Sequence, residues 1–352
     1  MRRKDPLIIG AGPAGSAAAI TLAQGGARPL ILERAPETGD ALCGGFLSWR
    51  TLRTLSTLGV ELNGHRVDHL RIFAGRHVAH APLPAAAMGI SRHALDTALL
   101  RRAVALGVGI ERGVMVRSIH DVEEQGAALF LATGKHDVKG SERAREAGDP
   151  AIGLRVRLPT SPALAREIGS AIELHLFDRG YACIDLQENG SANICLAVRK
   201  SLLTEAERNP HVLLERLAAT SPHFAARLQG FGSTTKIDAI AAVPYGWRAT
   251  QGRDGLFRLG DQCAVIPSLA GEGIGIALAS GRSAAAAFLD GGPIAATEWQ
   301  ARFGRQAARP LKIAGTVWQM AERPPLAAAA TLAMQLFPRL ASLVAQATRI
   351  EA

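Results

Sequence analysis

Three glycines near the start of the chain have the spacing of a phosphate-binding turn. They are Gly10, Gly12 and Gly15, and they follow directly on the apolar residues 7–9. In such a turn the first glycine allows the tight reversal, the second lets the backbone approach a pyrophosphate, and the third permits close packing of a helix on a strand. Backbone N–H groups at the start of the helix then favour a bound anion. The pattern therefore predicts a dinucleotide-binding turn.

The residues around the turn have the patterns of the helix and the strands that would hold the turn in place. Residues 16–24 are alanine-rich and stop at Gly25-Gly26, which indicates a helix with a glycine C-cap. A second apolar run, residues 29–32, ends in Glu33, 18 residues after Gly15. A carboxylate there accepts hydrogen bonds from ribose hydroxyls and repels a 2′-phosphate. Strand, turn, helix, strand and acidic residue together predict a Rossmann-like unit.

A second glycine-rich segment has the same kind of surroundings. The apolar residues 256–259 lead into Gly260-Asp261, and Gly271-Glu272-Gly273-Ile274-Gly275 precedes a helical stretch at 276–289. The carboxylate of Asp261 suits a ribose or ribitol hydroxyl, and the N–H groups of 271–275 suit a site where negative charge develops. An ordinary loop-to-helix turn is the alternative, and the pairing with the first segment favours the cofactor site.

With these two segments the chain resembles the FAD-dependent oxidoreductases built like p-hydroxybenzoate hydroxylase, and most closely their geranylgeranyl-reductase-like branch. The Gly-Asp and Gly-Glu-Gly-Ile residues of the second segment are similar to that branch. Cys43-Gly44-Gly45 resembles its segment beside the isoalloxazine ring, and Arg92 resembles the arginine that reaches the FAD diphosphate. Ala132-Thr133-Gly134 is similar to the strand end near the adenosine. The resemblance covers roughly residues 5–290 in order.

The resemblance implies FAD as the cofactor, with NADPH or NADH as a transient reductant, because no second dinucleotide fingerprint follows the first. The residues expected at the FAD are those of the two glycine-rich segments and the similar positions between them: Gly10, Gly12, Pro13, Ala14, Gly15, Glu33, Arg34, Cys43, Gly44, Arg92, Gly134, Gly260, Asp261, Gly271, Gly273 and Ile274.

The sequence constrains the chemistry of the substrate less than it constrains the identity of the cofactor. The aromatic substrate motif of the reductase branch is reduced here to Gly180–Leu186, without its tryptophan, phenylalanine and proline. Candidates near the ring are Cys43, Tyr181, Tyr245 and Trp247, with packing in the core as the alternative role for each. No Ser/His/Asp set or metal-ligand spacing stands out, so we expect no metal and chemistry carried by the flavin.

Three functions are open on these residues. The first is an NAD(P)H-using monooxygenase that hydroxylates an aromatic or polyketide-like apolar substrate. The second is a flavin-dependent reductase of isoprenoid double bonds, which the Gly-Glu-Gly-Ile segment favours and the reduced substrate motif disfavours. The third is a non-catalytic FAD-binding or electron-transfer module.

The expected fold is α/β (α+β), with a Rossmann-like FAD-binding domain interleaved with a β-sheet substrate domain and followed by C-terminal helices. The FAD-binding domain takes residues 1–60, 88–150 and 250–292, the substrate domain 61–87 and 151–249, and the helical segment 293–352. Within this frame we expect a strand at 113–119, one helix at 210–228, and C-terminal helices separated by prolines, Pro310 among them. The stretch 114–134 is too short for the full β-meander common in this fold.

Composition excludes several other classes. The 352 residues are 48% hydrophobic and 20% charged, with a net charge of +9 whose basic residues are scattered, so we expect no nucleic-acid partner. The four cysteines lie far apart, which suits a reduced, cytoplasmic chain. No apolar run reaches the roughly 20 residues that span a bilayer. We expect a small apolar organic substrate and no transmembrane segment, and leave peripheral membrane contact and oligomeric state open.

Overall fold

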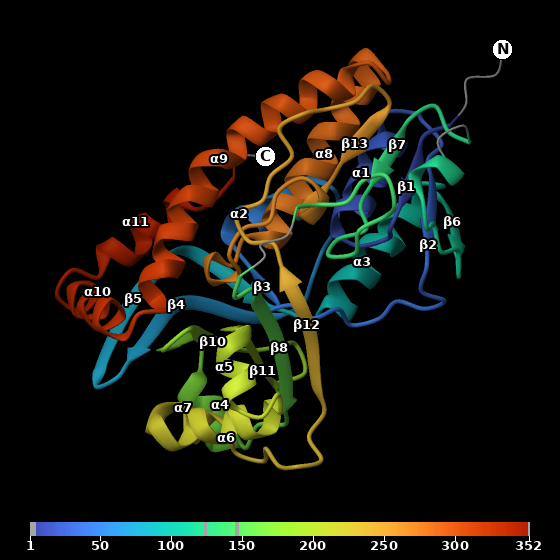
Figure 1. The fold of residues 1–352 in the computed structure, drawn as a ribbon. Helices are drawn as coiled ribbons and strands as arrows, with labels where there is room; N and C mark the ends of the chain where they lie inside the picture. The colour runs from blue at the N-terminus through green and yellow to red at the C-terminus, as the bar shows by residue number, and fades with distance from the viewer. Residues whose placement is uncertain (1–4, 123–124, 145–147, 351–352) are drawn as a thin grey trace.

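The computed structural model describes residues 5–122, 125–144 and 148–350, which fold around two β-sheets (Figure 1). The smaller sheet has five parallel strands in the order β13-β7-β1-β2-β6. Parallel strands covered on both faces are almost continuously apolar, and the central β1 and β7 are buried throughout. The strands are β1 (Leu7–Ile9), β2 (Leu30–Glu33), β6 (Gly109–Arg112), β7 (Leu129–Leu131) and β13 (Leu256–Arg258).

Three helices cover one face of this sheet, namely α1 (Pro13–Gln24), α3 (Arg92–Ala105) and α8 (Gly273–Gly291). The alanines of α1 and the small residues of α8 let the two helices approach closely. A Cβ added at Gly281 of α8 would lie 2.3 Å from the carbonyl oxygen of Ala14 in α1. No larger residue fits there, so the crossing holds the two helix starts close together.

The larger sheet has eight strands in the order β12-β8-β11-β10-β9-β4-β5-β3, antiparallel except for the pair β4–β9. Asn189-Gly190, a dipeptide typical of hairpin turns, lies in the hairpin between β10 and β11. The strands are β3 (Phe46–Leu47), β4 (His65–Ala74), β5 (His77–Gly89), β8 (Ala151–Leu158), β9 (Ala171–Phe177), β10 (Gly180–Leu186), β11 (Ala192–Arg199) and β12 (Ile237–Val243). Four short helices pack on this sheet around a second apolar core: α4 (Pro162–Ile168), α5 (Lys200–Glu205), α6 (Pro210–Thr220) and α7 (Pro222–Arg227).

The remaining helices lie at the edges of the two sheets. α2 (Trp49–Thr57) follows β3, and its N-cap Ser48 accepts a hydrogen bond from the N–H of Thr51. The C-terminal helices α9 (Ala295–Ala321), α10 (Pro324–Leu336) and α11 (Arg339–Ala347) run from the smaller sheet to β4 and β5 (Figure 1). Among the described residues, no single helix has both the length and the apolar composition to cross a bilayer. α10 and α11 have this length and composition only when they are taken together, and the pair is bent by 115°.

The architecture confirms the expected fold class, and local details differ. The prediction of a strand at 113–119 is wrong, because Gly113 has a φ of +75° and β6 ends at the residue before it. Pro310 does not end a helix; it lies on the buried face of α9, where core packing offsets the missing hydrogen bond. The helix expected at 210–228 breaks at Ser221, which caps α7. β3 pairs with β5 in the larger sheet, although the predicted division put residues 46–47 in the FAD-binding domain.

A buried ionic network ties α7 to the larger sheet. The carboxylate of Glu173 on β9 accepts hydrogen bonds from Arg227 at 2.7 and 2.9 Å and from Arg71 at 2.6 Å, and it faces His175 at 3.2 Å. Burial by itself would raise the pKa of Glu173, but the hydrogen bonds from His175 and Arg227 lower it to about 2. A folded-state pKa below the ordinary value of 4.5 means that the ionised form stabilises the fold.

We therefore expect Glu173→Gln to destabilise the protein at pH 7 by about 3–5 kcal/mol, because it leaves buried arginines without their carboxylate. The stabilisation by Glu173 is complete above pH 4.5 and is lost as pH falls towards about 2. Urea unfolding of the variant should therefore depend less on pH in that window than unfolding of the wild type. Identical pH dependence in both proteins would contradict this account of Glu173.

Candidate functional site

A single cavity of about 960 Å³ lies between the two sheets and receives both glycine-rich segments. The residues expected at the FAD all line it, except Gly15. Gly15 lies behind the wall, where an added Cβ would be 2.0 Å from the carbonyl oxygen of Gly10 and 3.1 Å from the side chain of Ile8. This is the close helix–strand contact that its spacing predicts. The positions suggested by sequence therefore converge on one site.

The glycine turn between β1 and α1 leaves the start of the helix open. Gly10 has a φ of +103°, and a Cβ there would lie 2.5 Å from the carbonyl oxygen of Ala132, so only glycine fits. Gly12 is the N-cap of α1 and no side chain caps the helix. The first N–H groups of a helix have no partner within it. They are therefore available to an anion in the cavity.

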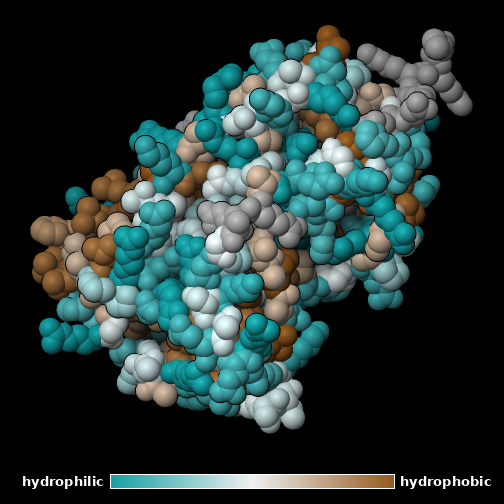
Figure 2. Space-filling model, in the orientation of Figure 1, coloured by the Kyte–Doolittle hydropathy of each residue, from teal (hydrophilic) through white to brown (hydrophobic). Residues whose placement is uncertain are grey.

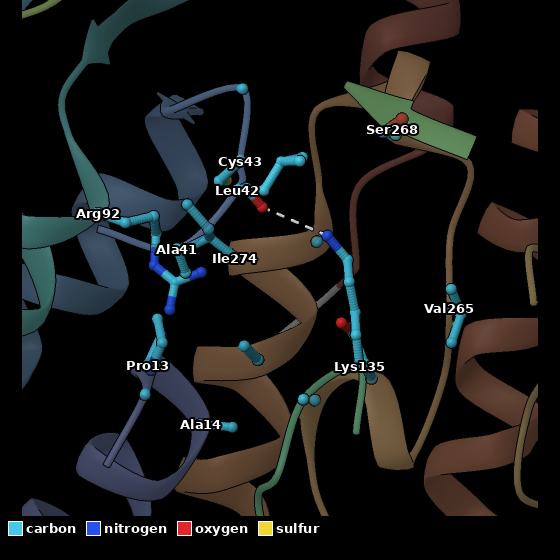
Figure 3. Close-up of a pocket in the computed structure, with 18 of the residues that line it drawn as sticks. Pro13, Ala14, Ala41, Leu42, Cys43, Arg92, Lys135, Val265, Ser268 and Ile274 are labelled. Carbon is cyan, nitrogen blue, oxygen red and sulfur yellow. Dashed lines mark hydrogen bonds between the residues drawn. The ribbon is translucent and has the colours of Figure 1, made fainter. Parts of the chain in front are cut away.

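Arg92 places a fixed positive charge opposite this helix start. Its guanidinium is near Pro13 (Figure 3) and donates to the carboxylate of Asp96 at 2.7 and 2.9 Å. Burial by itself would lower the pKa of Arg92, but the Asp96 carboxylate more than compensates and the pKa is raised. A Cβ on Gly12 would lie 3.5 Å from Nη2 of Arg92. Helix start and guanidinium together form a site for a diphosphate.

Glu33 and the loop after β7 form the next part of the cavity wall. The carboxylate of Glu33 accepts hydrogen bonds from the N–H groups of Ala11 and Ala35 at 2.7 and 2.9 Å, which fixes its orientation. An ionised carboxylate has about four acceptor sites, so ribose hydroxyls can still bind. Arg34 contacts Nε2 of His136 at 2.6 Å, and burial and this charge lower the pKa of His136.

Two buried side chains that the sequence did not single out hold this loop against Asp261. Gln262 donates to the carbonyl oxygens of Gly134 and His136, both at 2.9 Å. Arg143 donates to the carboxylate of Asp137 at 2.6 Å and to the carbonyl oxygen of Asp261 at 2.9 Å. All of these bonds except the one from Arg143 to Asp137 link residues more than a hundred positions apart in the chain, and no local pattern predicts them.

The second glycine-rich segment ends in another uncapped helix. No side chain caps α8, and a Cβ on its first residue, Gly273, would have no atom within 4 Å. Glu272 turns away from the cavity, where it accepts from Nη1 of Arg349 at 2.8 Å and from Ser48 at 3.3 Å. Arg349 also donates to the carbonyl oxygen of Ala270 at 2.7 Å. The end of the described chain therefore fastens this segment, a contact that the sequence did not reveal.

The loop with Cys43 is held from the larger sheet and from across the cavity. Nδ2 of Asn193 donates to the carbonyl oxygen of Gly44 at 2.8 Å, and Sγ of Cys195 donates to that of Cys43 at 3.0 Å. Nζ of Lys135 donates to the carbonyl oxygen of Leu42 at 3.3 Å (Figure 3). The loop is fixed through its backbone, which leaves Cys43 in the cavity wall.

The chain has two tyrosines, and both hydroxyl groups meet at Ser268. The Tyr245 hydroxyl lies 2.7 Å from Oγ of Ser268, and the Tyr181 hydroxyl contacts the same atom. Burial raises the pKa of Tyr245 to about 12 and raises that of Tyr181 well above 10. Both phenols therefore stay protonated at neutral pH. Ser268 precedes the second glycine segment in the chain, but its type alone did not mark it as part of the site.

Beyond these hydroxyls the cavity is apolar, and we call this part the apolar chamber. Its wall comes from both strands and C-terminal helices: Leu70, Ile72, Ile172, Leu174, Leu269, Val317, Met334 and Val344. We call a second part of the cavity wall the cofactor cradle: residues 10–14, Glu33, Arg92, Gly134, Asp261, Gly271, Gly273 and Ile274.

Trp247 does not line the cavity, contrary to the expectation that it walls the substrate. It follows Gly246, which has a φ of +84°, in the turn after β12. The ring of Trp247 instead lies 6.0 Å from the guanidinium of Arg143.

The cradle fits FAD on the features of the chain itself. Two uncapped helix starts and Arg92 suit the diphosphate and the part of the ring that becomes negative on reduction. Gly44, Gly134 and Gly273 leave space where a Cβ would have no atom within 4 Å. In the described part of the chain no group of three or more His, Cys, Asp or Glu side chains is placed to hold a metal.

Fold and site together define a flavin-binding member of the dinucleotide-binding proteins, and the comparisons agree. Residues 3–140 match the family described as FAD binding domain. The chain is 28% identical over 314 residues to menaquinone reductase of Mycobacterium tuberculosis, which covers 80% of this chain and 75% of that protein. The protein is an FAD-dependent oxidoreductase.

Solved structures share the fold at low identity. A variant of the halogenase PltM in complex with FAD has a TM-score of 0.77 at 14% identity, covering 98% of this chain and 82% of that chain. Pseudomonas aeruginosa PqsL in complex with 2-aminobenzoylacetate has a TM-score of 0.72 at 16% identity, covering 93% and 99%.

The open start of α1 gives a prediction that separates FAD binding from stability. Gly12 has an extended backbone (φ −72°, ψ −175°), so Gly12→Asp should be accommodated without strain. Aspartate is a good N-cap, and its carboxylate would pair with Arg92 in the place of the diphosphate. We expect FAD affinity to fall at least about tenfold, since repulsion of roughly 1.4 kcal/mol suffices, while the melting temperature of the apoprotein stays the same or rises.

FAD content by absorbance and thermal unfolding of the apoprotein check this expectation. Gly232→Asp is the matched control, since Gly232 is exposed, outside the cavity, and has no atom within 4 Å of an added Cβ. Full FAD content in the Gly12→Asp protein would show that the diphosphate does not lie at α1.

The start of α8 gives a second prediction, about redox potential. If this helix start faces the flavin ring, the carboxylate of Gly273→Asp opposes the negative charge that the ring gains on reduction. We expect the two-electron midpoint potential to fall by about 30 mV or more, which corresponds to ~1.4 kcal/mol. Spectroelectrochemical titration of the FAD-loaded variant measures it. An unchanged potential would place the ring elsewhere.

Proposed function

We propose that this FAD-dependent oxidoreductase reduces a carbon–carbon double bond in a large apolar substrate of isoprenoid or isoprenoid-quinone type. NADPH or NADH supplies the reducing equivalents. The observation that carries the proposal is the position of the Tyr181–Ser268–Tyr245 hydroxyl cluster. Ser268 precedes Gly271 of the cofactor cradle by three residues, and Tyr181 packs with residues of the apolar chamber. Such a cluster offers a proton at the place where a substrate in the chamber would meet the cofactor.

The apolar chamber supports a substrate that is mostly hydrocarbon. Leu70, Ile72 and Leu174 from the larger sheet pack in one cluster with Tyr181, and Met334 of α10 lies against them. Each buried methylene of a substrate gains about 0.8 kcal/mol from leaving water. The motif at Gly180–Leu186 lacks most of the aromatic residues of the reductase branch. Aliphatic residues of β4, β9 and the C-terminal helices supply the apolar wall instead. The relative that reduces menaquinone, by its name, supports a quinone with an apolar tail as a substrate to test.

Reduction of a double bond adds one hydride and one proton. When bound, FAD supplies the hydride after NAD(P)H has reduced it. The hydroxyl of Tyr181 is placed to give the proton to the other carbon. Ser268 and Tyr245 then stabilise the phenolate by hydrogen bonds and return a proton to it from solvent, because the Tyr245 side chain is only half-buried. The surrounding aliphatic residues exclude water from the reacting carbons.

Hydroxylation of an aromatic apolar substrate is the second candidate. The observation in its favour is the hydroxyl cluster itself, since Ser268 and the two tyrosines would also anchor a phenolic ring beside the cradle. The fold shared with PqsL, which binds 2-aminobenzoylacetate, is compatible with it. A non-catalytic electron-transfer module explains neither the apolar chamber nor the buried hydroxyls.

One experiment separates the candidates. The FAD-loaded protein is reduced anaerobically with NADPH or NADH, and menaquinone in detergent is added while flavin absorbance is followed. The flavin should reoxidise without oxygen, and the quinone ring of the product is then reoxidised in air. A product that still carries two added hydrogens in its isoprenoid chain supports the reductase, because air reverses reduction of the ring alone. A product that appears only with oxygen and gains one oxygen atom supports the hydroxylase. Flavin that menaquinone does not reoxidise, and that oxygen reoxidises without a product, contradicts both.

Tyr181→Phe tests the proton donor. We expect kcat for the reduction to fall by about 10²-fold or more, since a positioned acid contributes that much, with FAD content unchanged. Tyr245→Phe should cost less, because the hydroxyls of Tyr181 and Ser268 remain. In the wild type, deprotonation of the phenols should lower the rate only as pH approaches the raised pKa of about 12, not near 10. Wild-type turnover in Tyr181→Phe would exclude this role.

A further inference from the structure

The outer faces of α10 and α11 expose a group of large apolar side chains. Leu336 and Phe337 are each 65% exposed, and the group as a whole is Leu326, Leu332, Leu336, Phe337, Leu340 and Leu343. Figure 2 shows apolar atoms gathered at the left edge of the molecule, where Figure 1 places α10. Large contiguous apolar patches on a protein surface usually mark a binding surface. We call this group the apolar face.

The same two helices form part of the wall of the apolar chamber. Met334 of α10 and Ala341, Val344 and Ala345 of α11 line the cavity. Each helix therefore presents apolar residues both outward and inward. The outer apolar face and part of the chamber wall therefore belong to the same two helices.

The exposed charged residues of the segment that carries the apolar face are arginines. Between residues 324 and 348 the only charged residue is Arg339, which is exposed, and exposed Arg323 precedes the segment. Arg76, at the turn between β4 and β5, shares a surface depression with Pro324 and Pro325. The chain as a whole has a net charge of +9. An apolar helical face with a cationic rim suits the interface of an anionic bilayer.

The geometry of the helix pair decides how it would meet a membrane. α10 and α11 are bent by 115° to each other and are short, so they can lie in the interface without crossing it. A second copy of the chain would also cover an apolar face. However, two copies would bring the arginines of both rims together, whereas anionic lipid neutralises them.

We propose that α10 and α11 dock on the surface of an anionic lipid bilayer and that the substrate passes from the bilayer into the apolar chamber at these helices. The substrate route rests on the proposed function, whereas the docking surface rests on the exposed side chains alone. Insertion of the apolar face would place the chamber directly above the hydrocarbon in which an isoprenoid substrate dissolves.

Vesicle co-sedimentation of the FAD-loaded full chain tests the docking. The vesicles are phosphatidylcholine with or without phosphatidylglycerol, and no substrate is added. We expect binding to the anionic vesicles and weaker binding to the neutral ones. The double variant Leu336→Ser, Phe337→Ser should weaken binding by at least about tenfold, because it removes two inserted side chains. Arg323→Gln with Arg339→Gln should weaken binding about tenfold on anionic vesicles only.

Ile294→Ser is the matched control. Ile294 is 72% exposed, precedes α9 and lies outside the apolar face, so this variant should bind vesicles as the wild type does. FAD absorbance in each variant verifies that the fold is intact.

Three outcomes overturn the proposal: no binding to anionic vesicles, equal binding by the wild type and the Leu336→Ser, Phe337→Ser variant, or a dimer without lipid that this variant converts to a monomer. The last would assign the apolar face to a second copy. Turnover of detergent-dispersed menaquinone needs no bilayer. A protein that turns it over but binds no vesicles therefore loses the docking proposal and keeps the proposed function.

Discussion

The site depends on two helices that begin, without side-chain caps, at the same cavity. α1 and α8 leave their first N–H groups to a ligand, and this works only because the helices cross closely enough for both starts to reach one cofactor. Two glycines without side chains allow that approach: Gly281 lies against the backbone of Ala14, and Gly15 lies against the backbone of Gly10. A methyl group at either glycine would separate the elements and open the cradle.

Charge at the cavity is arranged so that the anionic cofactor meets positive potential. Three carboxylates near the cradle have partners within the chain: Asp96 pairs with Arg92, Glu272 pairs with Arg349, and Glu33 accepts from backbone N–H groups. The buried guanidinium of Arg92 stays charged because its partner raises its pKa. Polar groups thus concentrate on the cradle, and the apolar chamber is left to α9–α11 and the larger sheet. This separation of polar and apolar walls makes one cavity suitable for both a charged cofactor and an apolar substrate.

The end of the described chain connects these two walls. Arg349, just after α11, holds Glu272 and the carbonyl oxygen of Ala270, which follow Ser268 in the same loop. The end of α11 is therefore fastened to the segment that carries Ser268.

The sequence by itself determined the cofactor half of the protein. The spacing of Gly10, Gly12 and Gly15, and of the second segment around Gly273, reflects requirements of the local backbone, and such requirements act over a few residues. Strand and helix periodicity likewise gave the order of β1, α1 and β2 and the Rossmann-like class. A local error arose at Gly113, where the predicted strand does not form because this residue has a positive φ.

Only the tertiary structure decided the substrate half. Three separate segments carry Tyr181, Tyr245 and Ser268. Their hydroxyl groups meet only because the larger sheet packs against the loop that contains Ser268. Arg143, Gln262 and Asn193 act through hydrogen bonds across more than a hundred residues of chain, for which no spacing rule exists. The sequence of α10 and α11 indicates only that these helices are apolar. In the fold, one face of each helix lines the cavity and the other face is exposed. Periodicity reports that a helix has apolar faces, but only packing determines what covers each of them.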